Sequence, residues 1–462
     1  MAVANSPTHL DPRVGTDQIS GKLCQLLLNG LVTKNEHGNV VPDLAASWEV
    51  LDGGLRYRFH LRSGVRFHDG RPLTSRDVVW TYGSILDGTV ATAKRAAFAV
   101  VDHLEAVDDL TVDLVLPEPF GALLVDLTPE QGIVPSGMSP EEMNRHPVGT
   151  GPFRFVSRTP ELVVVEANPD YWNGPPGLER VVFKEVPDAT VRALELLKGS
   201  VQLVVNDLAP DVVPLFRRNP HFQVIESPGS NYAYLGLNFQ DPQLADPRVR
   251  RALALSIDRQ RLVDTLWRGL GVVTETMLPQ GLWATHEGLP LLPHDPAEAR
   301  RLLDEAGYPD PDGDGPEPRL HLSYKTSNNE TYLLQAQVIQ NMAREAGIEI
   351  EVRAYEFATY YADVKKGSFQ VFSGIRTGIV DPNIFRLVLH SSATPPSGQN
   401  RGRYHNPEFD RLIDEGARHT LPEDRRPYYL EAQEIFAREL PYISLYTRVN
   451  YAVLPRGLEG YV

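Results

Sequence analysis

Residues 319–355 of the chain read RLHLSYKTSNNETYLLQAQVIQNMAREAGIEIEVRAY, and they carry its clearest fold signal. Residues 319–325 and 348–355 are strand-like, with apolar side chains repeating at the spacing of half-buried strands. Between them, residues 332–346 have the apolar spacing of a helix, which Gly347 ends. The pattern predicts a βαβ unit with a right-handed crossover.

Weaker patterns extend this organisation along the chain in both directions. A helix at 360–366 and a strand at 369–373 extend the unit to βαβαβ. A middle block adds a helix at 189–198, capped by Asp188, and a series of strands at 162–167, 181–186, 201–205 and 222–226. Three further helices each begin with a cap and a proline, at Asp246-Pro247, Asp295-Pro296 and Asn406-Pro407.

The N-terminal block follows the same α/β pattern. Strands are expected at 55–61 and 112–116, and a helix between them opens at Thr74 with Asp77 in a capping-box arrangement. A final strand at 442–454 is too long and apolar for a tail, so we expect it to return to an earlier sheet and to form part of a hinge. The predicted fold class is α/β, with mixed sheets flanked by helices.

Composition excludes several classes of function. The chain has 462 residues, 42% hydrophobic and 23% charged, which predicts a soluble globular protein of about three domains. Its net charge of −15 disfavours nucleic acid as a partner. A single cysteine, Cys24, excludes an internal disulfide, and no apolar run reaches the ~20 residues of a membrane helix.

No catalytic or cofactor motif is present, so we expect neither an enzyme nor a cofactor. The histidines have no metal-ligand spacing. Asp310, Asp312 and Asp314 match the first half of a calcium loop, but His321 stands where the loop needs a glutamate, and a solvated turn is the favoured interpretation. Four tyrosines at predicted crossings or in loops suit either the core or a ligand site: Tyr232, Tyr234, Tyr404 and Tyr446.

Several segments carry a resemblance to a known family. Residues 42–48 (PDLAASW) and 57–78 (YRFHLRSGVRFHDGRPLTSRDV), followed by 148–153 (VGTGPF), 168–174 (NPDYWNG) and 246–253 (DPRVRRAL), resemble the extracellular solute-binding proteins of the peptide and nickel uptake family, family 5. These proteins serve ABC transporters. The resemblance covers essentially the whole chain.

The resemblance implies a two-lobed fold of the periplasmic-binding-protein type II. Lobe I would comprise residues 1–42, 152–237 and 442–462, with residues 43–151 as an extra subdomain on it, and lobe II residues 238–441. A peptide or related small polar solute would bind in the cleft between closing lobes. We expect a monomer that delivers its ligand to the permease subunits of an ABC importer.

The same resemblance implies a periplasmic or extracellular protein that associates with the membrane through the transporter. No signal-peptide pattern is found in residues 1–7. Two other functions stay open: a hydrolase acting on peptides or glycosides in the cleft, and a sensor that presents its ligand to a signalling partner.

Ligand contacts of the family, carried over by position, come from an early loop, the crossing strands and the far lobe. They fall on Asp17, Gln18, Ser20, Asn231, Tyr232, Tyr234, Arg376, Thr377, Gly378, Asp381, Asn400, Arg403, Tyr404 and Tyr446. No metal ligand is expected among them.

The chain departs from the family pattern in residues 376–381. Arg376 replaces a tryptophan of the dipeptide binders, and Ile379 stands where they have the aspartate that pairs with a peptide amino terminus. Asp381 is the expected substitute, and Val380 and Thr394 disfavour a nickel chelate. Arg376 and Arg403 suit either a carboxylate or phosphate of the ligand, or a solvated surface.

Overall fold

The computed structural model describes residues 1–35, 38–313, 315–396 and 398–461. The chain forms two compact units. Unit 1 contains Met1–Ile225, Ala417–Pro422 and Tyr451–Val462, and unit 2 contains Glu226–Gly416 and Glu423–Asn450.

The βαβαβ segment predicted from residues 319–373 is confirmed in unit 2. It consists of β14 (Leu320–Ser327), α10 (Glu330–Arg344), β15 (Ile348–Tyr355), α11 (Phe357–Lys366) and β16 (Val371–Arg376). Strand β14 lies between β15 and β16 and is parallel to both. Because parallel strands need helical crossovers, this order places α10 and α11 directly after the carboxyl ends of β14 and β15.

The sheet of unit 2 continues through two long strands. β12 (Phe222–Leu237) runs antiparallel to β16, with Tyr232 opposite Arg376, and β17 (Tyr442–Pro455) is its next neighbour. A short strand, β13 (Gly271–Val273), pairs with β17. The predicted end of β12 at residue 226 is wrong, because residues 227–231 (SPGSN) resemble a turn but remain extended in the sheet.

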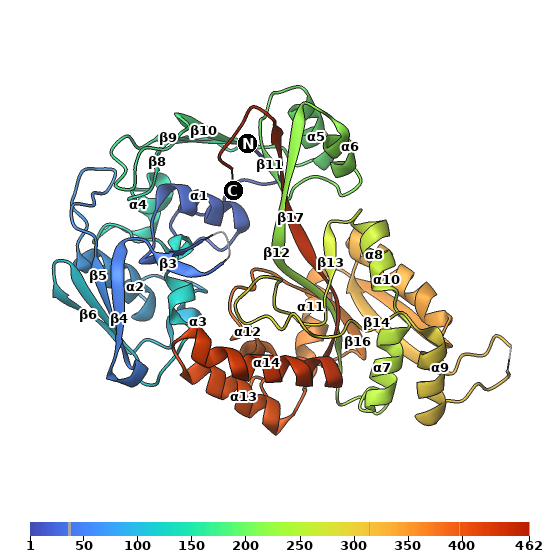
Figure 1. Ribbon diagram of the computed structural model, residues 1–462. Coiled ribbons are helices and arrows are strands. Elements are labelled where there is room, and N and C mark those ends of the chain that lie inside the picture. Colours follow the sequence, from blue (N-terminus) through green and yellow to red (C-terminus); the bar gives the residue numbers. More distant parts are fainter. Residues whose placement is uncertain (36–37, 314, 397, 462) are drawn as a thin grey trace. The chain divides into compact units, whose positions relative to one another are not determined.

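The remaining helices of unit 2 are α7 (Pro247–Leu255), α8 (Arg259–Leu266), α9 (Pro296–Glu305), α12 (Ile384–Leu389), α13 (Pro407–Arg418) and α14 (Pro422–Glu439), the last two with an end in unit 1. The predicted caps Asp246 and Asp295 accept hydrogen bonds from the first turns of α7 and α9. Figure 1 shows α7 and α9 packed side by side. Helix α14 has no counterpart among the predicted elements.

Unit 1 contains a mixed sheet of short strands. Its order is β11-β1-β10-β9-β8, and the end of β17 pairs with β11. The strands are β1 (Ala2–Val3), β8 (Phe153–Arg158), β9 (Leu162–Ala167), β10 (Arg180–Glu185) and β11 (Val204–Val205). The helices are α1 (Gln18–Leu27), α4 (Pro140–Arg145), α5 (Ala189–Leu197) and α6 (Val213–Arg218).

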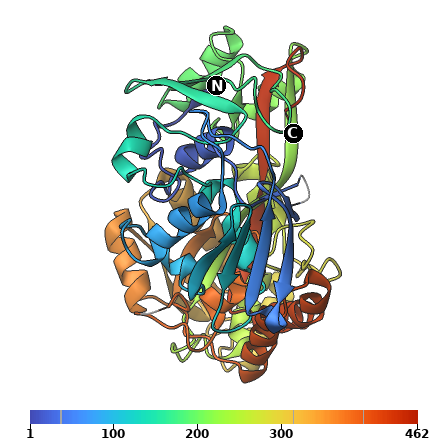
Figure 2. The same ribbon diagram turned by 90° about the vertical axis from the view of Figure 1, so that its left-hand side faces the viewer.

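Residues 43–151 of unit 1 have an antiparallel sheet of their own. Its order is β4 (Ala45–Leu51), β5 (Arg56–Leu61), β7 (Thr111–Val115) and β6 (His103–Asp108), and it faces the viewer in blue and teal in Figure 2. Helix α2 (Ser75–Leu86) packs against β6 and β7 and begins with the predicted Thr74–Asp77 capping box. The smaller elements are α3 (Arg95–Phe98), β2 (Val32–Lys34), β3 (Val40–Pro42), η1 (Asp52–Gly54), η2 (Leu123–Leu127) and η3 (Pro129–Gln131).

Candidate functional site

A cavity of about 200 Å³ opens in unit 2 at the carboxyl ends of β14 and β16. In open α/β sheets this edge is where ligands bind, because the following loops and helix starts converge there. The lining residues come from five segments: Tyr234, Ser327, Tyr332, Gln335, Phe357, Tyr360, Tyr361, Phe372, Ser373, Gly374, Ile375, Arg376 and Arg401.

The start of each crossover helix places side chains in this cavity. The Asn329 side chain caps α10 by accepting from the backbone of Thr331, and the first turns of α10 then present Tyr332 and Gln335. Glu356 caps α11 in the same way. A short connection after each strand therefore fixes where the lining side chains lie.

Aromatic rings form much of the cavity wall. Phe357 is 60% exposed and stacks on Tyr361, with ring centroids 5.7 Å apart and an interplanar angle of 15°. Tyr360 is buried and donates a hydrogen bond to the backbone oxygen of Ser373. Burial raises the pKa of the Tyr360 hydroxyl, so this group is a neutral donor.

The charged groups of the cavity are two arginines. Arg376 Nη1 donates to Gln399 Oε1 at 2.8 Å. Arg401 Nη2 donates to the Tyr361 hydroxyl at 2.7 Å, and its guanidinium lies 4.7 Å from the centroid of the Tyr361 ring. Within the described part of the chain, neither guanidinium has a carboxylate within 4.0 Å. Both retain N–H donors for a ligand.

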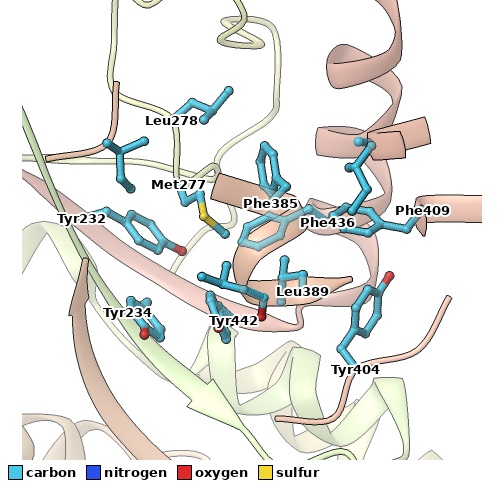
Figure 3. Packing of buried hydrophobic residues seen from close by; sticks show 14 of the residues in the cluster. Tyr232, Tyr234, Met277, Leu278, Phe385, Leu389, Tyr404, Phe409, Phe436 and Tyr442 are labelled. Atoms are coloured by element: carbon cyan, nitrogen blue, oxygen red, sulfur yellow. Dashed lines mark hydrogen bonds between the residues drawn. The ribbon is translucent and has the colours of Figure 1, made fainter. Parts of the chain in front are cut away.

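Of the four tyrosines expected at crossings or in loops, three are core residues. The fourth, Tyr234, is a core residue that also lines the cavity. The rings of Tyr232 and Tyr234 stack at 5.4 Å, and Tyr234 stacks on Tyr442 at 4.2 Å (Figure 3). The Tyr232 hydroxyl bonds to Ser444 at 2.7 Å, and that of Tyr404 donates to Glu439 at 2.7 Å. Tyr446 is fully buried and donates to Gln335. Tyr234 alone of the four also lines the cavity.

The carboxylate of Asp381 is already paired. Its two oxygens accept from Arg425 Nη2 at 2.8 Å and Nη1 at 2.9 Å, and the side chains of Asp381 and Arg425 are 9% and 3% exposed. The Arg425 guanidinium also lies over the rings of Trp283 and Tyr429. Asp381 therefore fixes the segment after β16 to helix α14.

The other expected contacts of unit 2 surround this segment. Gly378 donates its backbone N–H to Asn231 Oδ1 at 3.2 Å, and both Thr377 and Gly378 are exposed. Asn400 is fully buried and bonds to backbone groups of the neighbouring loop, including both the N–H and the oxygen of Tyr404. Arg403 is partly exposed in a left-handed backbone conformation and does not line the cavity.

The expected contacts of unit 1 lie at the start of α1. Asp17 caps the helix by accepting from Ile19 and Ser20, and its carboxylate also accepts from Thr8. Burial raises the pKa of Asp17, but the hydrogen bonds from Ser20 and Thr8 outweigh it and leave the pKa below its ordinary value. Ser20 is fully buried, whereas Gln18 is exposed.

The aspartates of the calcium-loop candidate are engaged within the protein. Asp310 accepts from Arg319 at 3.1 Å, and Asp312 accepts from the backbone of Glu317. Asp314 lies outside the described residues. The described residues contain no group of three His, Cys, Asp or Glu side chains placed to hold a metal ion.

A larger cavity of about 430 Å³ lies beside β13 and β17 in unit 2. Its buried acid, Glu275, is paired with Arg259 at 2.5 Å and also accepts from the backbone of Leu292. The smaller cavity, with two arginines free of carboxylates, is therefore the better candidate site.

Among the described helices, none has the length and apolar character to cross a membrane.

Sequence reasoning found two of the cavity's lining residues, Tyr234 and Arg376, and missed Arg401 and the aromatic residues of α10 and α11. The predicted βαβαβ order could have indicated the residues of α10 and α11, because the residues that follow parallel strands meet at one edge of the sheet. Arg401 has no such signal. Its loop reaches the cavity from a distant part of the chain.

Comparison with known proteins identifies the family. The sequence profile of the bacterial extracellular solute-binding proteins, family 5 Middle, matches residues 39–395. Heme-binding protein A of Haemophilus influenzae is 30% identical over 95% of this chain and 84% of its own length. Probable di/tripeptide-binding protein 5 of Pseudomonas aeruginosa is 31% identical over 94% of this chain and 87% of its own length.

The structure of HbpA2 from Haemophilus parasuis superimposes with a TM-score of 0.88 and 27% identity, covering 98% of this chain and 95% of that one. The resemblance and the fold class predicted from the sequence are thereby confirmed. The chain belongs to the bacterial extracellular solute-binding proteins of family 5, and it has the two-lobed fold of the substrate-binding components of ABC importers.

Proposed function

We propose that the chain binds a peptide or a related small polar solute outside the cytoplasm and delivers it, chemically unchanged, to the permease subunits of an ABC importer. The observation that carries this proposal is the cavity at the ends of β14 and β16, whose walls combine aromatic rings with guanidinium donors. Such a mixture of apolar surface and a few polar groups suits a small solute. The relatives named for heme and for di- and tripeptides support the class of function.

We extend the proposal to the remaining expected contacts and to the lobes. The exposed Gln18 at the start of α1, and the segment from Arg376 to Gly378, would contribute to binding from lobe I and lobe II. Residues 43–151 would form the extra subdomain, and their separate sheet supports this division.

The cavity gives no support to a hydrolase. A hydrolytic mechanism needs an acid and a base, or a nucleophile with a base, within reach of one bond. The lining of the cavity contains no Asp, Glu, His or Cys side chain. We therefore propose a binding protein rather than an enzyme.

Thermal denaturation in the presence of peptides of two to nine residues tests the proposal. A bound ligand raises the melting temperature, and at a hundred times its Kd it adds about 2.7 kcal/mol to the free energy of unfolding. Mass spectrometry of the recovered peptide then separates binding from turnover. No shift with any peptide, or cleavage of those that bind, would contradict the proposal.

A further inference from the structure

The cavity at the ends of β14 and β16 carries positive charge without a balancing negative charge. Arg376 and Arg401 line it, and none of the lining residues is acidic. The chain as a whole has a net charge of −15, so this cavity differs in sign from the average surface. Low-dielectric walls strengthen the attraction of such a cavity for an anion.

Both guanidinium groups are held in place by uncharged neighbours. The Tyr361 ring and hydroxyl hold Arg401, and Gln399 holds Arg376. A carboxylate partner would have neutralised them, whereas an amide and a phenol leave the charge available. A fixed planar guanidinium is suited to bidentate recognition of a carboxylate.

None of the described residues that line the cavity has a carboxylate to pair with a ligand's amino group. Asp381 is the acidic residue of the segment that follows β16, and both of its oxygens accept from Arg425. An ammonium ion placed beside this pair would also meet the positive charge of Arg425. The cavity therefore attracts the anionic end of a ligand. It either does not attract the cationic end or repels it.

The aromatic wall defines the part of the ligand next to the anionic group. Phe357 is 60% exposed at the cavity and stacks on Tyr361, so burial of this ring against a ligand group is favourable. A volume of about 200 Å³ accepts a ring or a branched side chain but not a long peptide.

Resting on the proposed function, we propose that Arg376 and Arg401 select a small organic anion, in which a carboxylate lies next to an aromatic or branched apolar group and a free amino terminus is not required. In a peptide ligand this group is the C-terminal residue with its carboxylate. The two arginines are then the specificity-determining residues of the site.

Four versions of the peptide Ala-Ala-Phe test this inference by calorimetry: unmodified, N-acetylated, C-amidated, and modified at both ends. We expect amidation to weaken binding at least tenfold and acetylation to weaken it less than threefold. Equal binding of acid and amide, or a larger effect of acetylation than of amidation, would overturn the inference while leaving peptide binding intact.

Two variants test whether Arg376 and Arg401 cause the preference for a free carboxylate. Arg376→Gln and Arg401→Gln should each lower the affinity for the N-acetylated acid at least tenfold and change that for the doubly modified peptide less than twofold. Arg344→Gln is the matched control, because Arg344 lies on the surface of α10 and pairs with Glu349. Unchanged affinity for the acid in both cavity variants, with melting temperatures near that of the wild type, would refute the assignment.

A second pair of probes separates this inference from peptide transport. If none of the four peptides binds, the peptide form of the proposed function fails. Phenylpropionate and phenylpropionamide then report on the anion site alone. If phenylpropionate binds and Arg376→Gln loses this binding, the inference is supported. If the protein shows no preference for phenylpropionate over phenylpropionamide, the inference is overturned.

Discussion

His68 links two segments of unit 1 through its neutral imidazole. Nδ1 accepts from the Gly149 N–H at 3.2 Å, so Nε2 carries the proton and donates to the Gly151 oxygen at 3.0 Å. Burial lowers the pKa of His68 from 6.5 to about 4. Because the folded-state pKa is depressed, the stability that this group contributes is complete above pH 6.5 and is lost as the pH falls toward 4.

As the pH falls from 7 to 4, we expect the titration of His68 to lower the free energy of unfolding by up to about 3 kcal/mol. Each unit of pKa shift corresponds to about 1.36 kcal/mol. His68→Gln removes the titration and retains a donor and an acceptor. Urea denaturation at several pH values measures the effect as the difference between the two proteins. Parallel pH profiles of wild type and variant would contradict the prediction.

The Asp381–Arg425 ion pair is buried and connects the segment after β16 to helix α14. Its partners are 9% and 3% exposed, so removing one charge leaves the other buried and unpaired. We expect Arg425→Met to lower the free energy of unfolding by about 3–5 kcal/mol. The double variant with Asp381→Asn should recover most of this loss, as measured by urea denaturation. A double variant as unstable as Arg425→Met would show that packing of Arg425 on its two rings, rather than charge, is the larger contribution.

Gly149 and Gly151 lie against the end of α1, and neither position has room for a Cβ. A Cβ on Gly149 would lie 2.0 Å from the Leu27 oxygen, and one on Gly151 would lie 2.5 Å from the Leu26 oxygen. These neighbours are backbone atoms, which cannot move aside without displacing the helix end. The two glycines of the VGTGPF segment are therefore required by close packing.

We expect Gly149→Ala to destabilise the protein by at least about 2 kcal/mol, because the added methyl group overpacks the contact. Gly177→Ala is the matched control, since a Cβ there meets no atom within 4 Å and the backbone is not left-handed. That change should alter stability by less than about 0.5 kcal/mol. Thermal denaturation of both variants checks the contrast, and equal effects would contradict the packing argument.

The ends of some elements were predicted correctly, whereas other elements differ in their ends or were not predicted. Strands 162–167 and 348–355 form as predicted, because alternation and flanking turn residues agree there. β11 is shorter than the predicted 201–205, since only Val204 and Val205 pair with neighbours. Helix α14 went unassigned, and it contains Pro427, a residue that usually argues against a helix interior.

The chain crosses between its two units four times, at 225/226, 416/417, 422/423 and 450/451. Binding proteins of this architecture respond to ligand by closing about such crossings. We expect a saturating ligand to lower the radius of gyration measured by small-angle X-ray scattering. Saturation shown by calorimetry together with an unchanged scattering profile would contradict closure.

The sequence by itself determined the family and the α/β character of the chain. Both depend on local information: periodicity and caps in residues 319–355, and the motifs at 57–78, 148–153 and 168–174. Such signals lie within a few turns or one strand, so they can be recognised without knowing which segments meet.

Only the tertiary structure decided which charged and aromatic side chains are available to a ligand. Asp381 finds its partner 44 residues away in Arg425, and Tyr446 bonds to Gln335, 111 residues away. Arg401 and Arg403 are two positions apart, yet Arg401 lines the cavity and Arg403 does not. A charge is free or paired according to its neighbours in space, and those neighbours come from segments that local patterns cannot connect.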